Sequence, residues 1–130
     1  MKRLLLPLLA ALALPTAVQA ESRKEFKPAS KSEINLYRQT AVSDFCLSRQ
    51  SRISFSNAIR TAARKYTLAV TQKHKGLIEE IKNTTLPRAQ IFKIAYLQTL
   101  YGAIQTCPNS VPNHEIRKLE FTLKRLNQSK

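Results

Sequence analysis

The sequence predicts an all-α protein, a compact bundle of about four helices with one disulfide bond after an N-terminal signal peptide. Three observations support this fold class. Apolar residues recur at steps of three and four over long segments, alternation with a period of two never lasts, and the hairpin dipeptides Asn-Gly and Asp-Gly do not occur. We therefore expect helices throughout the folded part of the chain and no strands.

The first twenty residues have the organisation of a secretory signal peptide. Residues 2–3 are basic, residues 4–14 form an apolar run, and residues 18–20 fit the small-residue pattern that a signal peptidase accepts. The run is shorter than the roughly 18 residues that a permanent membrane-spanning helix needs, so cleavage after Ala20 is expected, with a retained anchor as the alternative. This predicts export through the secretory route to a periplasmic or extracellular location.

The only two cysteines are Cys46 and Cys107, and both follow the predicted signal peptide. An exported chain with one cysteine pair is expected to form a disulfide in an oxidising compartment. Closing a loop of about 62 residues would stabilise the fold by on the order of 4 kcal/mol. Two buried free thiols, or a metal site that recruits His74 or His114, are the alternatives.

The mature chain begins with a polar segment, residues 21–31, that we interpret as a flexible lead-in to one helical domain over residues 32–130. A first helix is predicted over about residues 33–48, with Ser32 as its N-cap. A second follows over about residues 55–82 with Ser54 as its cap. Lys73 interrupts the apolar stripe of this helix and Gly76 weakens its backbone, so a kink or split is expected near residues 73–76.

A third helix, from Leu86 to about residue 106, follows Thr85 as its predicted cap and is apolar almost all round, which predicts that the other helices pack around it. A fourth helix begins near residue 113. Its seam of Ile116, Leu119, Leu123 and Leu126 suits packing against one partner helix. If the first and third helices lie along one bundle axis, a bond between Cys46 and Cys107 makes them roughly parallel.

The charge of the chain is strongly positive. The sequence has 22 basic and 8 acidic residues, and removing Lys2 and Arg3 leaves 20 against 8, a formal charge of +12. Such an excess attracts anions without choosing among them. An acidic protein and an anionic lipid or polysaccharide surface are the candidate partners, and nucleic acid is a further candidate that no motif supports. The candidate anion-binding residues lie on the second and fourth helices: Arg60, Arg64, Lys75, Lys82, Arg117, Lys118, Lys124 and Arg125.

The inventory of catalytic residue types is thin. No zinc-protease, Cys-x-x-Cys, hydrolase-elbow or phosphate-loop motif occurs, and the chain has only two glycines. We therefore expect no catalytic residue, cofactor or metal site. An enzyme would need Asp44, His74 or His114 to converge with another polar residue. His74 is expected on the exposed side of the second helix as an ordinary surface histidine, with a pH-sensitive switch as the alternative.

These observations favour a small exported, non-enzymatic helical protein that binds an acidic partner or anionic surface through basic helix faces. The alternative is a packing subunit or client-holding factor. It would use apolar surface of the third helix around Phe92, Tyr96 and Leu100, because this helix has more apolar faces than a small bundle readily covers.

Overall fold

A computed structural model describes residues 26–81 and 84–128, and this part of the chain is all-helical, as predicted. The predicted signal peptide, residues 1–20, lies outside the described residues. Extended pairing in the described part is limited to two isolated bridges, Ala29 with Ile78 and Leu77 with Thr85. No described helix combines the length and the apolar composition that crossing a membrane requires. The helices are α2 Lys31–Gln50, α3 Phe55–His74, α4 Arg88–Thr106, the 3-10 helix η1 Pro108–Ser110, and α5 Asn113–Gln128.

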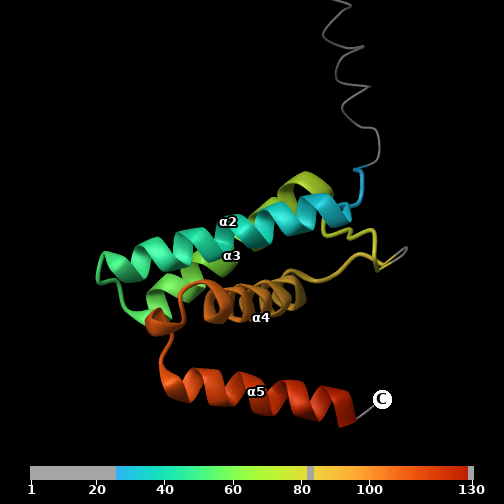
Figure 1. Cartoon of the computed structure of the whole chain (residues 1–130). Coiled ribbons are helices and arrows are strands. Elements are labelled where there is room, and N and C mark those ends of the chain that lie inside the picture. The colour runs from blue at the N-terminus through green and yellow to red at the C-terminus, as the bar shows by residue number, and fades with distance from the viewer. Residues whose placement is uncertain (1–25, 82–83, 129–130) are drawn as a thin grey trace, which may run out of the picture.

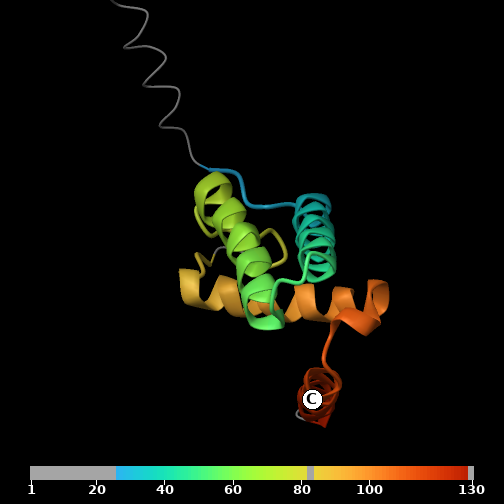
Figure 2. The same ribbon diagram turned by 90° about the vertical axis from the view of Figure 1, so that its left-hand side faces the viewer.

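The four α-helices form three layers (Figure 1). α2 and α3 pack together in the first layer, α4 crosses beneath both of them, and α5 lies on the opposite side of α4 (Figure 2). α4 is therefore the central helix and packs against each of the other three, as its nearly continuous apolar character predicts.

The core lies between α4 and the α2–α3 pair. The side chains of Phe45, Ile59, Val70 and Ile91 are each at most 1% exposed. At the crossing of α2 and α4, a Cβ atom added to Gly102 would lie 2.5 Å from Cγ2 of Val42. The missing side chain of Gly102 therefore allows these two helices to approach closely.

The predicted disulfide between Cys46 and Cys107 is present and joins the last turn of α2 to the residue that ends α4. The two Cα atoms are 6.1 Å apart, within the range that a disulfide allows. It does not make the two helices parallel, because α4 crosses α2 rather than sharing a bundle axis with it (Figure 2).

Two of the three predicted N-caps were wrong. The cap of α2 is Ser30 rather than Ser32: the Ser30 hydroxyl accepts from the Glu33 amide at 3.2 Å, and Glu33 Oε1 accepts from the Ser30 amide at 3.1 Å. Ser54 caps α3, as predicted. Thr85 does not cap α4. It pairs with Leu77 instead, and α4 starts after Pro87 without a side-chain cap.

The second predicted helix ends at His74 rather than near residue 82. Lys75 and Gly76 both have left-handed backbones, with φ of 54° and 79°, and the amides of both donate to the carbonyl of Val70. The expected weak point near Gly76 is thus a termination rather than a kink. The following residues run along the lead-in, where the Ala29 amide donates to the Leu77 carbonyl and the Glu79 amide donates to the Ala29 carbonyl.

The described end of the predicted lead-in, residues 26–30, is consequently held in place instead of running free. Ala29 is completely buried, and this short pairing carries the chain across the C-terminal end of α3 before α2 begins. Residues 21–25 lie outside the described part of the chain. The crossing matters for the site because it places backbone carbonyls next to His74.

α5 packs less completely than its regular apolar seam predicts. Leu119 is 5% exposed, but Leu123 is 39% and Leu126 is 56% exposed. The first half of the seam is covered by α4, whereas the second half remains open to solvent. Among the described elements, α4 is the main neighbour of α5.

Candidate functional site

The exposed side of α3 carries the first predicted basic pair. Arg60 and Arg64 lie one helical turn apart, and both are exposed. Among the described residues, no carboxylate lies within ion-pair distance of either guanidinium. The neighbouring Lys65 differs, because its Nζ lies 3.4 Å from Oδ2 of Asp44 in an exposed ion pair. Arg60 and Arg64 are thus available to an external anion.

One further candidate, Lys75, does not belong to this face. Lys75 was predicted on the second helix, but it follows the end of α3, and its Nζ lies 5.8 Å from the centroid of the Phe26 ring. The prediction ran the helix to about residue 82 with a kink or split near residues 73–76, whereas the left-handed backbones of Lys75 and Gly76 end it at His74. Lys82 lies outside the described residues.

The outer side of α5 carries the remaining candidates, Arg117, Lys118, Lys124 and Arg125, which we call the α5 basic face. All four are exposed. Glu120 lies at helical spacing from Arg117 and Lys124. It forms no ion pair with a lysine or arginine in the described part of the chain.

Sequence reasoning missed the residue at the centre of this face. Phe121 lies three or four positions from each of the four cations, and it is 63% exposed, more than any other large apolar side chain in the described part. The available signal was its position outside the 116–119–123–126 seam, which turns it away from α4.

The two basic faces do not form one surface. α3 belongs to the layer on one side of α4, and α5 lies on the other side (Figure 2). The sequence could assign cations to each helix but not the relative placement of the helices. A small anion cannot contact both faces at once, so each has to be considered as a separate site.

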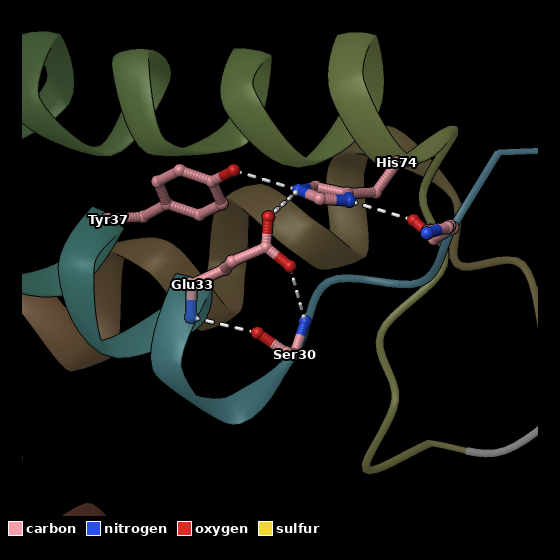
Figure 3. Close-up of polar contacts among 5 residues, drawn as sticks. Ser30, Glu33, Tyr37 and His74 are labelled. Carbon is pink, nitrogen blue, oxygen red and sulfur yellow. Dashed lines mark hydrogen bonds and ion pairs between the residues drawn. The ribbon is translucent and has the colours of Figure 1, made fainter.

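A partly exposed polar cluster surrounds His74, which is itself buried, contrary to the expected surface position (Figure 3). The histidine is 5% exposed. Its Nε2 lies 2.8 Å from the hydroxyl of Tyr37 and 3.5 Å from Oε2 of Glu33, while its Nδ1 lies 2.8 Å from the carbonyl oxygen of Lys27. The prediction failed because the covering groups come from α2 and from the segment before it.

The geometry of the cluster determines how its protons are arranged. A carbonyl oxygen only accepts, so Nδ1 of His74 carries a hydrogen, and in the neutral ring Nε2 accepts from Tyr37. The hydrogen bond from the Ser30 amide lowers the pKa of Glu33. Burial, together with the negative charge of Glu33, raises the pKa of Tyr37. Through its hydrogen bonds, the cluster joins the end of α3, the start of α2 and the segment that precedes α2.

The catalytic candidates are distributed over different helices. Asp44 pairs with Lys65, His74 with Tyr37, and His114 with its neighbour Glu115 at 3.4 Å. No hydrogen bond or ion pair connects any two of Asp44, His74 and His114. Over residues 26–81 and 84–128, no three His, Cys, Asp or Glu side chains are grouped so that they could hold a metal ion.

An apolar groove of about 290 Å³ opens beneath the second half of α5. None of the residues of the expected partner face, Phe92, Tyr96 and Leu100, lines this groove; Leu100 is 3% exposed, whereas Phe92 and Tyr96 are half-buried. The exposed ring on α4 belongs instead to Tyr101, at 46%. The groove is lined by Arg38 from α2, by Leu97, Gln98 and Tyr101 from α4, and by Leu119, Thr122, Leu123 and Leu126 from α5.

Comparison with known proteins places the chain without assigning an activity to it. No curated protein and no solved structure matches it. A domain of unknown function, DUF8650, matches residues 32–130, a stretch that includes α3, α4, α5, the disulfide and nearly all of α2. Both basic faces, the groove and three members of the His74 cluster lie in this matched region, and the chain belongs to the DUF8650 family.

Proposed function

We propose that this protein is a small exported, non-enzymatic helical protein that binds an acidic partner or anionic surface through the basic faces of α3 and α5. The observation that carries the proposal is the α5 basic face, four exposed cations of which none forms an ion pair with a described carboxylate. Arg60 and Arg64 provide a second, separate face. A disulfide and the absence of a spanning helix in the described part are compatible with an extracytoplasmic location.

The distribution of charge on these faces favours anion binding over a role in solubility alone. A surface that serves only solubility commonly intersperses both signs, whereas these faces present cations alone or in excess. The excess of +12 after the predicted cleavage adds long-range attraction for any anionic partner. Because the cations are exposed, binding should weaken steeply with salt.

Retention on immobilised heparin, eluted with a salt gradient, tests the proposal. The variants are Arg60→Glu with Arg64→Glu, Lys118→Glu with Arg125→Glu, and all four together. Each removed cation should lower affinity by about five-fold at low salt. Since the faces lie on opposite sides of α4 and act as separate sites, each double variant should keep the retention of its intact face, and the four changes together should lower retention furthest.

The matched control reverses two exposed cations of α4 elsewhere, Arg88→Glu with Lys93→Glu, and so changes the net charge equally. This control should elute at higher salt than either face variant. If it elutes as early as they do, attraction depends on total charge only, and the two faces are not binding sites.

The groove beneath α5 favours a second candidate function, the holding of an apolar partner segment. Its occupant would be an amphipathic helix with acidic residues, whose apolar side contacts Leu123 and Leu126 and whose acidic side meets Arg38. A second copy of this chain is a poorer occupant because both copies are strongly cationic.

An anionic apolar dye such as an anilinonaphthalene sulfonate reports on this groove. Leu123→Ser with Leu126→Ser should reduce dye fluorescence, and Arg38→Gln should weaken binding. Leu36→Ser with Leu47→Ser, on exposed positions of α2, is the control and should leave the signal close to that of the parent. Equal losses in both double variants would remove the groove as the binding site.

A further inference from the structure

The α5 basic face has an aromatic ring at its centre that is largely exposed, since Phe121 is 63% exposed. Phe121 follows Arg117 and Lys118 by four and three residues, and it precedes Lys124 and Arg125 by three and four. On a helix these spacings place all four cations within one turn of the ring, two toward each end. Neither of the cation–ring contacts in the described part involves Phe121.

The position of α5 makes this face accessible to a large flat partner. The helix seats Leu119 against α4, so its other side points away from the molecule. No other described element lies beyond α5 (Figure 1). A planar surface could therefore approach along the 16 residues of the helix without meeting another helix first.

We infer that the α5 basic face docks onto an anionic lipid bilayer, with Phe121 entering the boundary between headgroups and acyl chains while the four cations contact headgroup phosphates. Lys and Arg are suited to this arrangement, because their aliphatic stems lie along apolar surface while their charged ends stay in the polar layer. The inference rests on the proposed function and names the anionic partner.

The shape of the face favours a bilayer over the other anionic partners. Single-stranded nucleic acid is held by successive aromatic rings along a positively charged groove, whereas this face is convex and has one ring. A rigid acidic protein would need a pocket that matches Phe121. A bilayer needs no such pocket, and an exposed apolar ring beside clustered cations combines insertion at the interface with electrostatic attraction to anionic headgroups.

The complete chain contains no tryptophan, so Phe121→Trp introduces a single fluorescent reporter at the proposed contact. Emission is measured with neutral phosphatidylcholine vesicles and with vesicles that also contain phosphatidylglycerol. We expect a blue shift and quenching by brominated acyl chains with the anionic vesicles only. Leu36→Trp, on an α2 position that is 58% exposed, is the matched control and should show neither change.

Co-sedimentation with the same vesicles measures how strongly the protein and its variants partition onto the bilayer. Phe121→Ser should lower the partition coefficient by roughly ten-fold, as expected for the loss of one partly inserted aromatic side chain. Lys118→Gln with Arg125→Gln should lower it by about 25-fold at low salt. Leu36→Ser should bind as the parent does, and circular dichroism of each variant verifies that the helices remain folded.

The outcomes separate the two proposals. Retention on heparin without binding to anionic vesicles would overturn the lipid inference and leave the proposed function standing. The same holds if Phe121→Ser binds vesicles as tightly as the parent, or if the fluorescence of the Phe121→Trp variant responds no more than that of the Leu36→Trp control. The face variants and the α4 charge control are compared for binding to heparin and to anionic vesicles. If they bind equally in both assays, the proposed function itself is overturned.

Discussion

The hydroxyl of Tyr37 on α2 donates a 2.8 Å hydrogen bond to Nε2 of His74, the last residue of α3, in the neutral state of the ring. The histidine is buried, and Tyr37 packs edge-on against the buried Tyr66. Tyr37 also sits beneath the ammonium of Lys73, whose Nζ is 5.9 Å from the ring centroid. One side chain therefore connects the two helices of the first layer through polar, aromatic and cation–ring contacts.

Tyr37→Phe should destabilise the protein by about 1–2 kcal/mol, because it preserves the ring and leaves Nε2 of a buried histidine without its donor. Urea unfolding followed by circular dichroism measures the change. Tyr101→Phe is the control. Its ring is 46% exposed and its hydroxyl has no hydrogen bond within the described structure, so the change should stay within about 0.5 kcal/mol. Equal effects would show that the hydrogen bond to His74 contributes nothing.

Replacing both Cys46 and Cys107 with serine should lower stability by about 2–4 kcal/mol, since the open chain regains the entropy that the closed loop removes. A reducing agent should lower the free energy of unfolding of the parent by a similar amount and leave that of the double variant unchanged. A parent protein whose unfolding is insensitive to reduction would contradict this prediction.

The helices and the cysteine pair were predictable because each depends on local pattern. The three-and-four spacing of apolar residues identified α2, α4 and α5 to within a few residues, and the apolar surround of α4 indicated its central place. Ser54 was recognisable as a cap because a helical stripe begins directly after it.

The features that went wrong depend on contacts between distant segments. Leu77 and Ile78 continue the phase of the α3 stripe, so the pattern could not show that Lys75 turns left-handed and ends the helix. His74 lies between two lysines and was assigned to solvent, yet the carbonyl of Lys27 and the hydroxyl of Tyr37 cover it. The position of Phe121 outside the apolar seam of α5 indicated that it turns away from α4, but its exposure also requires that no other helix cover that side, which no local pattern records.

Gly102→Ala should destabilise the protein by up to about 2 kcal/mol. Alanine gains about 1 kcal/mol of helix propensity over glycine, but overpacking at this crossing costs about 1–3 kcal/mol, since the new methyl group meets Val42 Cγ2 at 2.5 Å. In a Val42→Ala background the conflict is absent. There the same change should be neutral or stabilising by up to about 1 kcal/mol. A double-mutant cycle without coupling between the two positions would contradict the close crossing.

Glu33 should contribute to the loss of stability in acid. Its pKa in the folded protein lies below the ordinary value of 4.5, chiefly because the Ser30 amide donates to the carboxylate. A carboxyl group with a lowered pKa stabilises the fold above the unfolded-state value, and this stabilisation disappears as the pH falls through the folded-state pKa. Glu33→Gln retains a capping-box side chain and should flatten the decline of stability below about pH 4.5. A decline as steep as that of the parent would argue against this carboxylate as a source.

Tyr66 should dominate the loss of stability in alkali. Burial raises its pKa to about 12, and its hydroxyl donates a 2.6 Å hydrogen bond to Oε1 of Gln98. Because the folded state favours the protonated phenol, this stabilisation is complete below pH 10 and is lost as the pH rises toward 12. The total change is about 3 kcal/mol, at about 1.4 kcal/mol for each pKa unit.

Tyr66→Phe should cost about 1 kcal/mol at neutral pH through the lost hydrogen bond and then show a flatter decline between pH 10 and 12. Urea unfolding at several pH values measures both effects, and tyrosinate absorbance should lose its highest-pH step in the variant. Persistence of that step would assign the most strongly raised pKa to another tyrosine.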